Sequence, residues 1–233
     1  MKVLIIIPAY NEGENIRNLI WDLQKYNEFG YDILVINDGS TDDTARACRE
    51  EGITVIDLPC NLGIGGAVQT GYLYAEKNSY DIAIQVDGDG QHSPEYISEL
   101  IEPLRKEEVD LVIGSRYING IGFQSTRIRR IGIKFFTLLI WFLTRQCFTD
   151  PTSGFRACNK KVIQLFARNY PKDYPEPESL VFLKRYSCKI IEKPVVMKSR
   201  CNGESSINII QSIYYMIKVT LAILIDISRN KRG

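Results

Sequence analysis

Residues 82–95 read IAIQVDGDGQHSPE, a short apolar run that leads directly into two aspartates separated by one glycine. Such a run predicts a buried strand that ends near residue 86. Asp87 and Asp89 then lie in a turn that Gly88 and its neighbouring glycine relax, so both carboxylates can reach one ligand. Hard cations such as Mg²⁺ or Mn²⁺ take oxygen ligands, usually together with substrate phosphates, and Gln91 can add an amide oxygen. The stretch predicts a cation and diphosphate site, and the alternative is a solvated turn.

The same pattern recurs along the first half of the chain. Apolar runs predict strands at residues 2–7, 32–37, 53–58, 80–86 and 110–115. The segments between them predict helices at 12–26, after Ser40, at 66–78 and from Pro94. Strands that are apolar throughout and alternate with amphipathic helices predict an α/β fold, with a mostly parallel sheet flanked by helices.

A polar cluster follows each of these predicted strands. In chain order the clusters are PAYNE, NDGSTD, NLGIGG, DGDGQ and SRY. Ligands of parallel α/β sheets bind outside the carboxyl ends of the strands. Five polar loops at one edge favour a functional site over a set of solvated turns.

Length and composition restrict the class of protein. A chain of 233 residues can form one sizeable α/β domain. The six cysteines form no C-x-x-C pair and there is one histidine, so we expect reduced thiols rather than a structural zinc site. The N-terminal apolar run is too short for a signal peptide, which predicts a cytoplasmic protein. A net charge of +1 argues against a nucleic-acid partner.

Charge and hydropathy point to a membrane surface. Residues 111–149 contain no acid but several arginines and lysines, which predicts a region that attracts anions. Residues 131–143 are apolar but shorter than the roughly 20 residues of a membrane span. They either meet a bilayer or close the core. Residues 207–227 predict an apolar, amphipathic C-terminal helix at the membrane interface, with an oligomer contact and a membrane span as the second and third alternatives.

Seven motifs carry a resemblance to a known family. PAYNE, INDGSTD, NLGIGGA, VDGDGQHSPE, IGSRY, DPTSGFR and RCNGESS occur in the order found in family-2 glycosyltransferases of the GT-A (Rossmann-like) fold. Within this family, the chain most resembles the dolichol- and polyprenyl-phosphate sugar synthases. The resemblance covers residues 3–206. It implies a nucleotide-sugar-binding half at 1–117 and an acceptor half at 118–206, followed by the apolar helix and basic tail at 207–233.

The resemblance also implies the site residues. Asp87 is expected on the nucleotide side, and Asp89 with Gln91 is expected to hold a Mg²⁺ or Mn²⁺ cofactor. The residues expected to bind the nucleotide sugar are Pro8, Tyr10, Glu12, Ile36, Asp38, Asp87, Gly88 and Asp89. The arginines expected to bind the donor diphosphate or the acceptor are Arg116, Arg130, Arg156 and Arg200.

The implied reaction is an inverting transfer of a sugar from a nucleotide-diphosphate sugar to a polyprenyl phosphate in cell-envelope glycan assembly. The alternative acceptor is a hydroxyl of a lipid-linked saccharide. A phosphate acceptor is already nucleophilic, whereas a hydroxyl needs a carboxylate base, for which Asp150 and Glu178 are the candidates. Their structural alternatives are a turn or helix cap for Asp150 and a solvated helix start for Glu178. The expected location is the cytoplasmic face of the membrane, and a separate membrane protein and a second copy of the chain are further candidate partners.

Two other classes stay open as alternatives. A sugar-phosphate nucleotidyltransferase would carry a basic loop after its first strand, and PAYNEGEN has no basic residue. An inactive binding subunit would tolerate loss of Asp87 and Asp89, yet both are present. The chain departs from the family pattern at Asn37, where many relatives have an aspartate, so its nucleobase preference need not be theirs. It also has Ser206 in place of a frequent lysine and an unusual YPEPE segment, so mannose and dolichol specificity is not carried over. His92 is expected to support the site rather than to bind metal.

Overall fold

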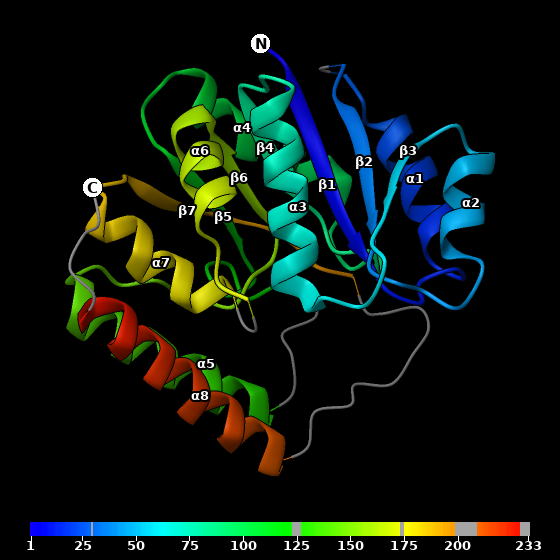
Figure 1. The fold of residues 1–233 in the computed structure, drawn as a ribbon. Coiled ribbons are helices and arrows are strands. Elements are labelled where there is room, and N and C mark those ends of the chain that lie inside the picture. The colour runs from blue at the N-terminus through cyan, green and yellow to red at the C-terminus, as the bar shows by residue number, and fades with distance from the viewer. Residues whose placement is uncertain (29, 123–126, 173–174, 199–208, 229–233) are drawn as a thin grey trace.

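A seven-stranded sheet in the order β3-β2-β1-β4-β6-β5-β7 forms the centre of the computed structural model, which describes residues 1–28, 30–122, 127–172, 175–198 and 209–228 (Figure 1). All pairs are parallel except those of β6, which runs antiparallel to both β4 and β5. The predicted mostly parallel sheet is confirmed, and its last two strands are not among the predicted ones. The strands are β1 (Val3–Ala9), β2 (Asp32–Asn37), β3 (Thr54–Asp57), β4 (Ile82–Gln85), β5 (Leu111–Ser115), β6 (Arg156–Asn159) and β7 (Ile190–Pro194).

Helices cover both faces of this sheet, because its strands are apolar on both sides. In β1, Leu4 and Ile6 belong to one core cluster, whereas Ile5 and Ile7 belong to the other. Successive side chains of a strand point to opposite faces, so one continuous apolar run supplies two cores. The first core contains α3 (Gly63–Lys77), α6 (Lys160–Arg168) and α7 (Pro175–Arg185), and the second contains α1 (Ile16–Lys25), α2 (Thr44–Glu50) and α4 (Ile97–Arg105).

The topology collects the predicted polar loops at one edge. Strand β5 is parallel to β4 although β6 lies between them, so the carboxyl ends of β1 to β5 share that edge. The antiparallel β6 begins there, with Arg156 opposite Gln85 of β4. Residues just before β6 therefore reach the same edge as the turn after β4. Strands from both predicted halves of the chain belong to one sheet.

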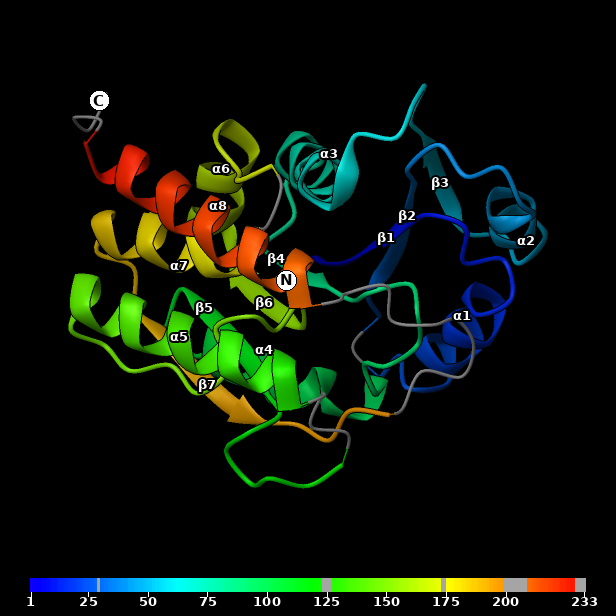
Figure 2. The same ribbon diagram turned by 90° about the horizontal axis from the view of Figure 1, so that it is seen from below.

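Helices α5 (Arg127–Thr144) and α8 (Ile209–Ser228) lie side by side next to α7 (Figures 1 and 2). Their inner faces close the first core through Phe136 and Ile140 of α5 and Val219 and Ile223 of α8. The core-closing alternative for residues 131–143 is therefore realised on this face of α5. Within the described part of the chain, no helix combines the length and apolar character needed to cross a bilayer.

Candidate functional site

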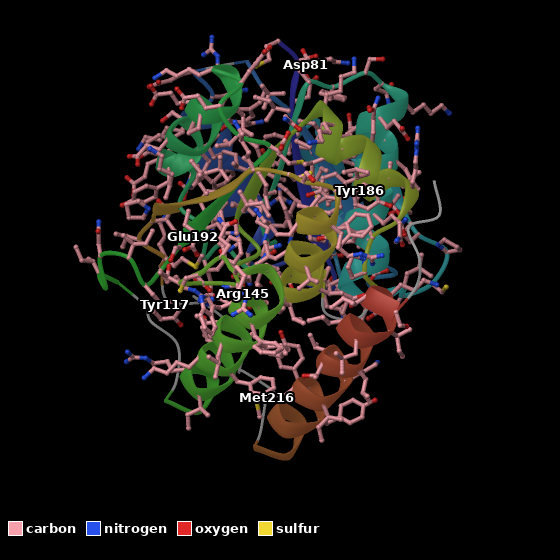
Figure 3. The ribbon with its side chains drawn as sticks, turned by 90° about the vertical axis from the view of Figure 1, so that its left-hand side faces the viewer. Asp81, Tyr117, Arg145, Tyr186, Glu192 and Met216 are labelled. Carbon is pink, nitrogen blue, oxygen red and sulfur yellow. The ribbon has the colours of Figure 1, made fainter. Side chains whose placement is uncertain are left out.

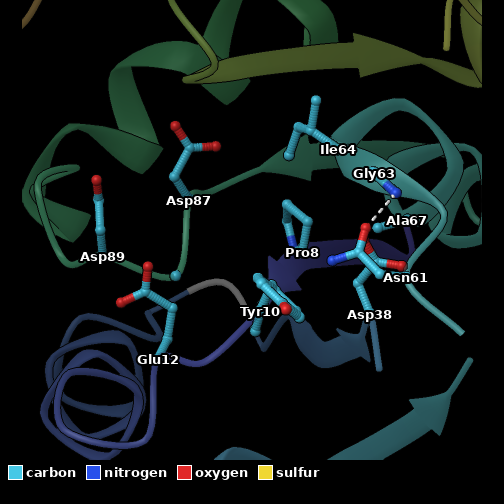
Figure 4. A pocket seen from close by; sticks show the side chains of 12 residues that line it. Pro8, Tyr10, Glu12, Asp38, Asn61, Gly63, Ile64, Ala67, Asp87 and Asp89 are labelled. Carbon is cyan, nitrogen blue, oxygen red and sulfur yellow. Dashed lines mark hydrogen bonds between the residues drawn. The ribbon is translucent and has the colours of Figure 1, made fainter. Parts of the chain in front are cut away.

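A pocket of about 300 Å³ opens at the carboxyl edge of the sheet (Figure 4). It contains all the predicted nucleotide-sugar residues except Ile36. The third polar loop, NLGIGGA, also lines the pocket, although none of its residues was predicted as a site residue. Its position directly after a predicted strand could have identified it. The lining residues are Pro8, Ala9, Tyr10, Glu12, Asp38, Asn61, Gly63, Ile64, Ala67, Asp87, Gly88 and Asp89.

The pocket is acidic. Its wall carries the carboxylates of Glu12, Asp38, Asp87 and Asp89, and the residues that line it include no lysine or arginine. A diphosphate entering such a pocket needs a cation to offset the negative charge. The described residues hold no cluster of three or more metal-binding side chains. This donor set fits Mg²⁺ or Mn²⁺, which are usually held by one or two carboxylates and the substrate's own phosphates.

Asp87 is held in place from three sides. Its backbone N–H donates to Nδ1 of His92 over 3.0 Å, which leaves the ring proton on Nε2, 3.6 Å from the Asp87 carboxylate. The His92 ring is buried and stacks on Phe155, with ring centroids 4.8 Å apart. The amide of Gln85 donates to Asp87 Oδ1 over 3.3 Å. His92 therefore has the supporting position that was expected for it.

Asp89 and Gln91, the residues predicted to share a metal ion, lie together in the turn after β4. The backbone N–H of Gln91 donates to Asp89 Oδ1 over 3.1 Å. The side-chain amide of Gln91 donates to the carbonyl of Lys198 over 3.3 Å, and the Lys198 N–H donates back to the Gln91 carbonyl over 3.0 Å. The segment that leads towards RCNGESS is thus attached directly to the Asp87–Asp89 turn.

Three N–H groups at the start of α3, those of Leu62, Gly63 and Gly65, already donate to protein atoms. Asp38 is buried, and its Oδ1 accepts the N–H of Leu62 over 2.7 Å. Gly63 donates to Asn61 Oδ1 over 2.9 Å, as Figure 4 shows, and Gly65 donates to the carbonyl of Lys172 over 3.0 Å. Helix N-termini often bind phosphate through such groups. Here these N–H groups have protein partners, which favours a cation over α3 as the partner of the diphosphate.

Asn37, the departure from the family pattern, has a structural partner. It is buried, its amide donates to Asp57 Oδ1 over 2.8 Å, and its Oδ1 accepts the N–H of Ser40 over 3.2 Å. An aspartate at position 37 would face the carboxylate of Asp57. The neighbouring strand therefore accounts for the amide at this position without reference to the nucleobase.

Asp150 and Arg116 form a buried ion pair. Arg116 donates from Nε to Asp150 Oδ2 over 2.6 Å and from a terminal nitrogen to Oδ1 over 2.7 Å. Burial lowers the pKa of Arg116, but the hydrogen bond to Asp150 and the charge of Asp150, with smaller effects from Tyr117 and Asp87, together raise the pKa above its ordinary value. The carboxylate of Glu192 (Figure 3) accepts the N–H groups of Thr149 and Asp150, over 2.7 and 2.8 Å. Both oxygens of Asp150 are engaged by Arg116, so the carboxylate fixes the orientation of the guanidinium.

The first turn of α7 brings an acid to the site that was not selected from the sequence. Burial raises the pKa of Glu176 to about 7; Arg156 opposes this rise, Asp87 adds to it, and the amide of Gln85 opposes it. Glu178, the predicted acid, lies two residues further along the same helix, and the side chains of both acids are half-buried. The sequence alone does not show which of the two acids of YPEPE faces the site, because each follows a proline. The partners of Glu176 identify it as the one close to Asp87.

The remaining predicted residues lie elsewhere. The side chain of Ile36 is fully buried in the core, which leaves only its backbone for a nucleobase. Arg130 is exposed on α5, outside the pocket lining. Arg156 is buried and donates to the carbonyls of Pro151 and Ser153, so it is placed for internal support rather than for contact with a phosphate. Arg200 falls outside the described residues.

Comparisons with known proteins agree with this geometry. The family model described as Glycosyl transferase family 2 matches residues 4–166. The UDP-N-acetylglucosamine–dolichyl-phosphate N-acetylglucosaminyltransferase of Methanococcus voltae is 31% identical over 217 residues, covering 83% of this chain and 84% of that protein. The undecaprenyl-phosphate mannosyltransferase of Micrococcus luteus is 30% identical over 217 residues, covering 89% of this chain and 88% of that protein.

A solved structure shares the fold. The glucosyl-3-phosphoglycerate synthase of Mycobacterium tuberculosis, crystallised with Mn²⁺, uridine diphosphate and glucosyl-3-phosphoglycerate, aligns with a TM-score of 0.73. The alignment covers 97% of this chain and 79% of that one at 21% identity.

Proposed function

The chain belongs to glycosyltransferase family 2, and from this premise we propose that it transfers a sugar from a nucleotide-diphosphate sugar to a polyprenyl phosphate. The observation that carries the proposal is the acidic pocket at the carboxyl edge of the sheet, where Asp87, Asp89 and Glu12 lie on one side of Pro8 and Asp38 lies on the other. Relatives named for transfer to dolichyl and undecaprenyl phosphates support this choice of acceptor.

The pocket suits the nucleotide end of the donor. Tyr10 is half exposed at its rim and offers a ring face to a base, while Pro8 and Ala67 supply apolar contact. Asp38 is held by Leu62, so its remaining acceptor capacity suits a ribose hydroxyl. Asp87 lies beyond these residues, at the diphosphate end.

Asp87, Asp89 and Gln91 are the residues that would hold Mg²⁺ or Mn²⁺. A bound divalent cation supplies positive charge to the departing nucleoside diphosphate. Arg116 is fixed by Asp150 in a bidentate pair and offers further positive charge at the same edge. The protein's task is to hold both substrates in line so that the attacking oxygen inverts the anomeric carbon.

The hydroxyl of a lipid-linked saccharide is the second candidate acceptor, and Glu176 favours it. A polyprenyl phosphate attacks as an anion and needs no base, whereas a hydroxyl loses a proton in the reaction. A carboxyl with a pKa of about 7 near Asp87 is suited to accept that proton. Glu176 replaces Glu178 and Asp150 as the residue to test for this role.

We also propose that the protein works at the cytoplasmic surface of a membrane. The outer faces of α5 and α8 form one apolar surface, called here the α5–α8 platform, seen side by side in Figure 3. Because the inner faces of both helices are packed in the core, these outer side chains are rigidly attached to the domain. The platform consists of Ile131, Phe135, Leu138, Trp141 and Phe142 of α5 and Tyr214, Ile217, Leu221, Leu224, Ile225 and Ile227 of α8, all exposed.

The composition of the platform fits the bilayer interface. Trp141 and Phe142 are covered by Arg145, whose guanidinium carbon lies 5.4 and 5.6 Å from their ring centres. Aromatic rings beside a cation suit the headgroup level, and the absence of acids from residues 111–149 suits anionic lipids. Eleven exposed apolar side chains on two adjacent helices mark an interaction surface. Its attachment to the domain would keep the pocket close to a lipid-linked acceptor.

A donor screen tests the proposal. Purified protein is incubated with Mn²⁺ or Mg²⁺, a panel of nucleotide sugars and a short-chain polyprenyl phosphate, and the lipid product is followed by mass spectrometry. We expect one donor to give a metal-dependent glycosyl phosphate and D89A to abolish it. Transfer to a lipid-linked saccharide but not to the phosphate would select the second candidate. Full activity of D89A would refute the metal role of Asp89.

A further inference from the structure

Arg156 is a buried cation held by neutral hydrogen-bond acceptors. Its side chain is 2% exposed, and within the described residues no carboxylate lies at ion-pair distance from it. Its guanidinium instead donates to three neutral oxygens: the carbonyl of Ser153 over 2.6 Å, the hydroxyl of Ser179 over 2.7 Å and the carbonyl of Pro151 over 2.9 Å. A buried charge is costly unless its hydrogen-bonding groups are satisfied. The burial of this charge is therefore better explained by a role in positioning other residues than by a gain in stability.

The three oxygens belong to two segments that meet at the functional edge. Pro151 and Ser153 lie in the turn that precedes β6, called here the 150–155 turn. Ser179 lies in α7, and its hydroxyl donates to the carbonyl of Glu176 over 2.9 Å. The planar guanidinium donates from three nitrogens held in a rigid fork, which reaches both segments at once, whereas a lysine ammonium donates its N–H groups from one nitrogen. Arg156 therefore connects the turn to the helix start that carries Glu176.

The 150–155 turn in turn supports Asp87. Gly154 lies so close to it that a Cβ atom at this position would stand 2.8 Å from Oδ2 of Asp87. Gln85, the β4 partner of Arg156 in the sheet, donates to Asp87 Oδ1 over 3.3 Å, and its amide would stand 3.1 Å from the same Cβ atom. A shift of the turn would therefore be transmitted to the Asp87 carboxylate.

We propose that Arg156 is a positioning residue: it ties the 150–155 turn to the first turn of α7, and so holds Asp87 and Glu176 in register with each other at the reaction centre. It contacts no substrate. This inference rests on the proposed function, because it assigns Asp87 to the donor site. It also replaces the phosphate-binding role expected for Arg156 from the sequence.

The test compares R156M, which keeps the volume and loses the donors, with R156K, which keeps the charge, and with S179A, which removes one acceptor. Binding of UDP and of GDP in the presence of Mn²⁺ is measured by calorimetry, and amide hydrogen exchange is measured along the chain. We expect R156M to bind the preferred nucleotide at least tenfold more weakly, with R156K intermediate and S179A less affected. Exchange should rise in residues 150–155 and 175–179 and stay unchanged in β1. The matched control is R168M, at an exposed arginine in α6.

The outcomes separate the two proposals. Absence of nucleotide binding in the unmodified protein would contradict the proposed function, whereas equal binding by the unmodified protein and R156M would overturn the inference on Arg156. A lower melting temperature with unchanged exchange at 150–155 and unchanged binding would also overturn it, because Arg156 would then be structural only. If R156M does not fold, R156K and S179A decide by the same two measurements.

Discussion

The backbone of Gly154 lies directly against the carboxylate of Asp87: a Cβ atom at position 154 would stand 2.8 Å from Oδ2 and 2.9 Å from Oδ1. G154A should therefore displace Asp87 without disturbing the core. We expect the catalytic efficiency of the metal-dependent reaction to fall roughly 10²-fold, the cost of a misplacement of about 1 Å. Steady-state kinetics at varied donor and Mn²⁺ concentrations would measure this loss.

The control for G154A is G132A. Gly132 lies in α5, and a Cβ atom there would meet no atom within 4 Å. Alanine at this position should leave the kinetics unchanged and raise the free energy of unfolding by ~0.5–1 kcal/mol, because glycine is a poor helix former. Equal kinetics for G154A and G132A would contradict the contact between Gly154 and Asp87.

Asn37 and Asp57 predict a charge effect on stability rather than on specificity. N37D would place a second carboxylate at the 2.8 Å contact with Asp57. We expect it to lower the free energy of unfolding by about 1–3 kcal/mol, the cost of an unsatisfied buried polar contact. Adding D57N should restore much of the loss, because the amide and carboxylate then exchange places. Urea unfolding of the four proteins measures the cycle, and a switch of nucleotide preference in N37D would contradict this view of Asn37.

The sequence predicted those parts of the fold that depend on local pattern. The five apolar runs became β1 to β5, because strands covered on both faces are apolar throughout and even the edge strand β3 keeps an apolar centre. Strands β6 and β7 were missed. Strand β6 has four residues and begins with Arg156, a charged residue whose burial depends on acceptors from a distant helix. No local window carries that information.

The candidate site, like the fold, has features that the sequence predicts and features that depend on tertiary packing. The edge that carries the pocket could be predicted because a polar loop follows each of the five strands, whereas the choice of Pro8, Asp38 and Asp87 within those loops came from the family resemblance. The role of Arg156 could not be predicted, because a sequence does not tell a buried arginine from an exposed one. The choice between Glu176 and Glu178 also needed the orientation of α7 against the sheet, which tertiary packing decides.

The α5–α8 platform predicts which leucines bind lipid. L138E and L221E each place a charge on its outer face, where Leu138 is 64% and Leu221 is 54% exposed. We expect each to weaken binding to vesicles of phosphatidylglycerol and phosphatidylcholine about tenfold, because the lost burial of one leucine is worth at least ~1.5 kcal/mol. The matched control is L73E in α3, 49% exposed but outside the platform. Vesicle sedimentation measures binding, and equal weakening by L73E would refute a specific lipid-binding face.

Glu176 predicts how both stability and activity depend on pH. Its carboxyl has a pKa of about 7 in the folded protein against an ordinary value of 4.5. Between these values the folded protein holds a proton that the unfolded chain has lost. The free energy of unfolding should therefore fall as the pH rises from about 4.5 to about 7. Above pH 7 Glu176 is ionised in both states and causes no further change. E176Q should flatten that slope in urea unfolding at pH 5, 6, 7 and 8, whereas E178Q should keep it.

The same pair of variants decides between the two acceptors. If Glu176 takes a proton from an acceptor hydroxyl, activity should rise as pH passes about 7, and E176Q should lose roughly 10²–10⁴-fold in kcat, the usual contribution of a general base. If the acceptor is a polyprenyl phosphate, which needs no base, E176Q should retain most of its turnover with that acceptor. Loss of activity in E178Q with E176Q unaffected would show that the wrong acid of YPEPE has been assigned to the site. Rate measurements from pH 5.5 to 8.5 with both acceptors separate these cases, because only the hydroxyl reaction requires the ionised carboxylate of Glu176.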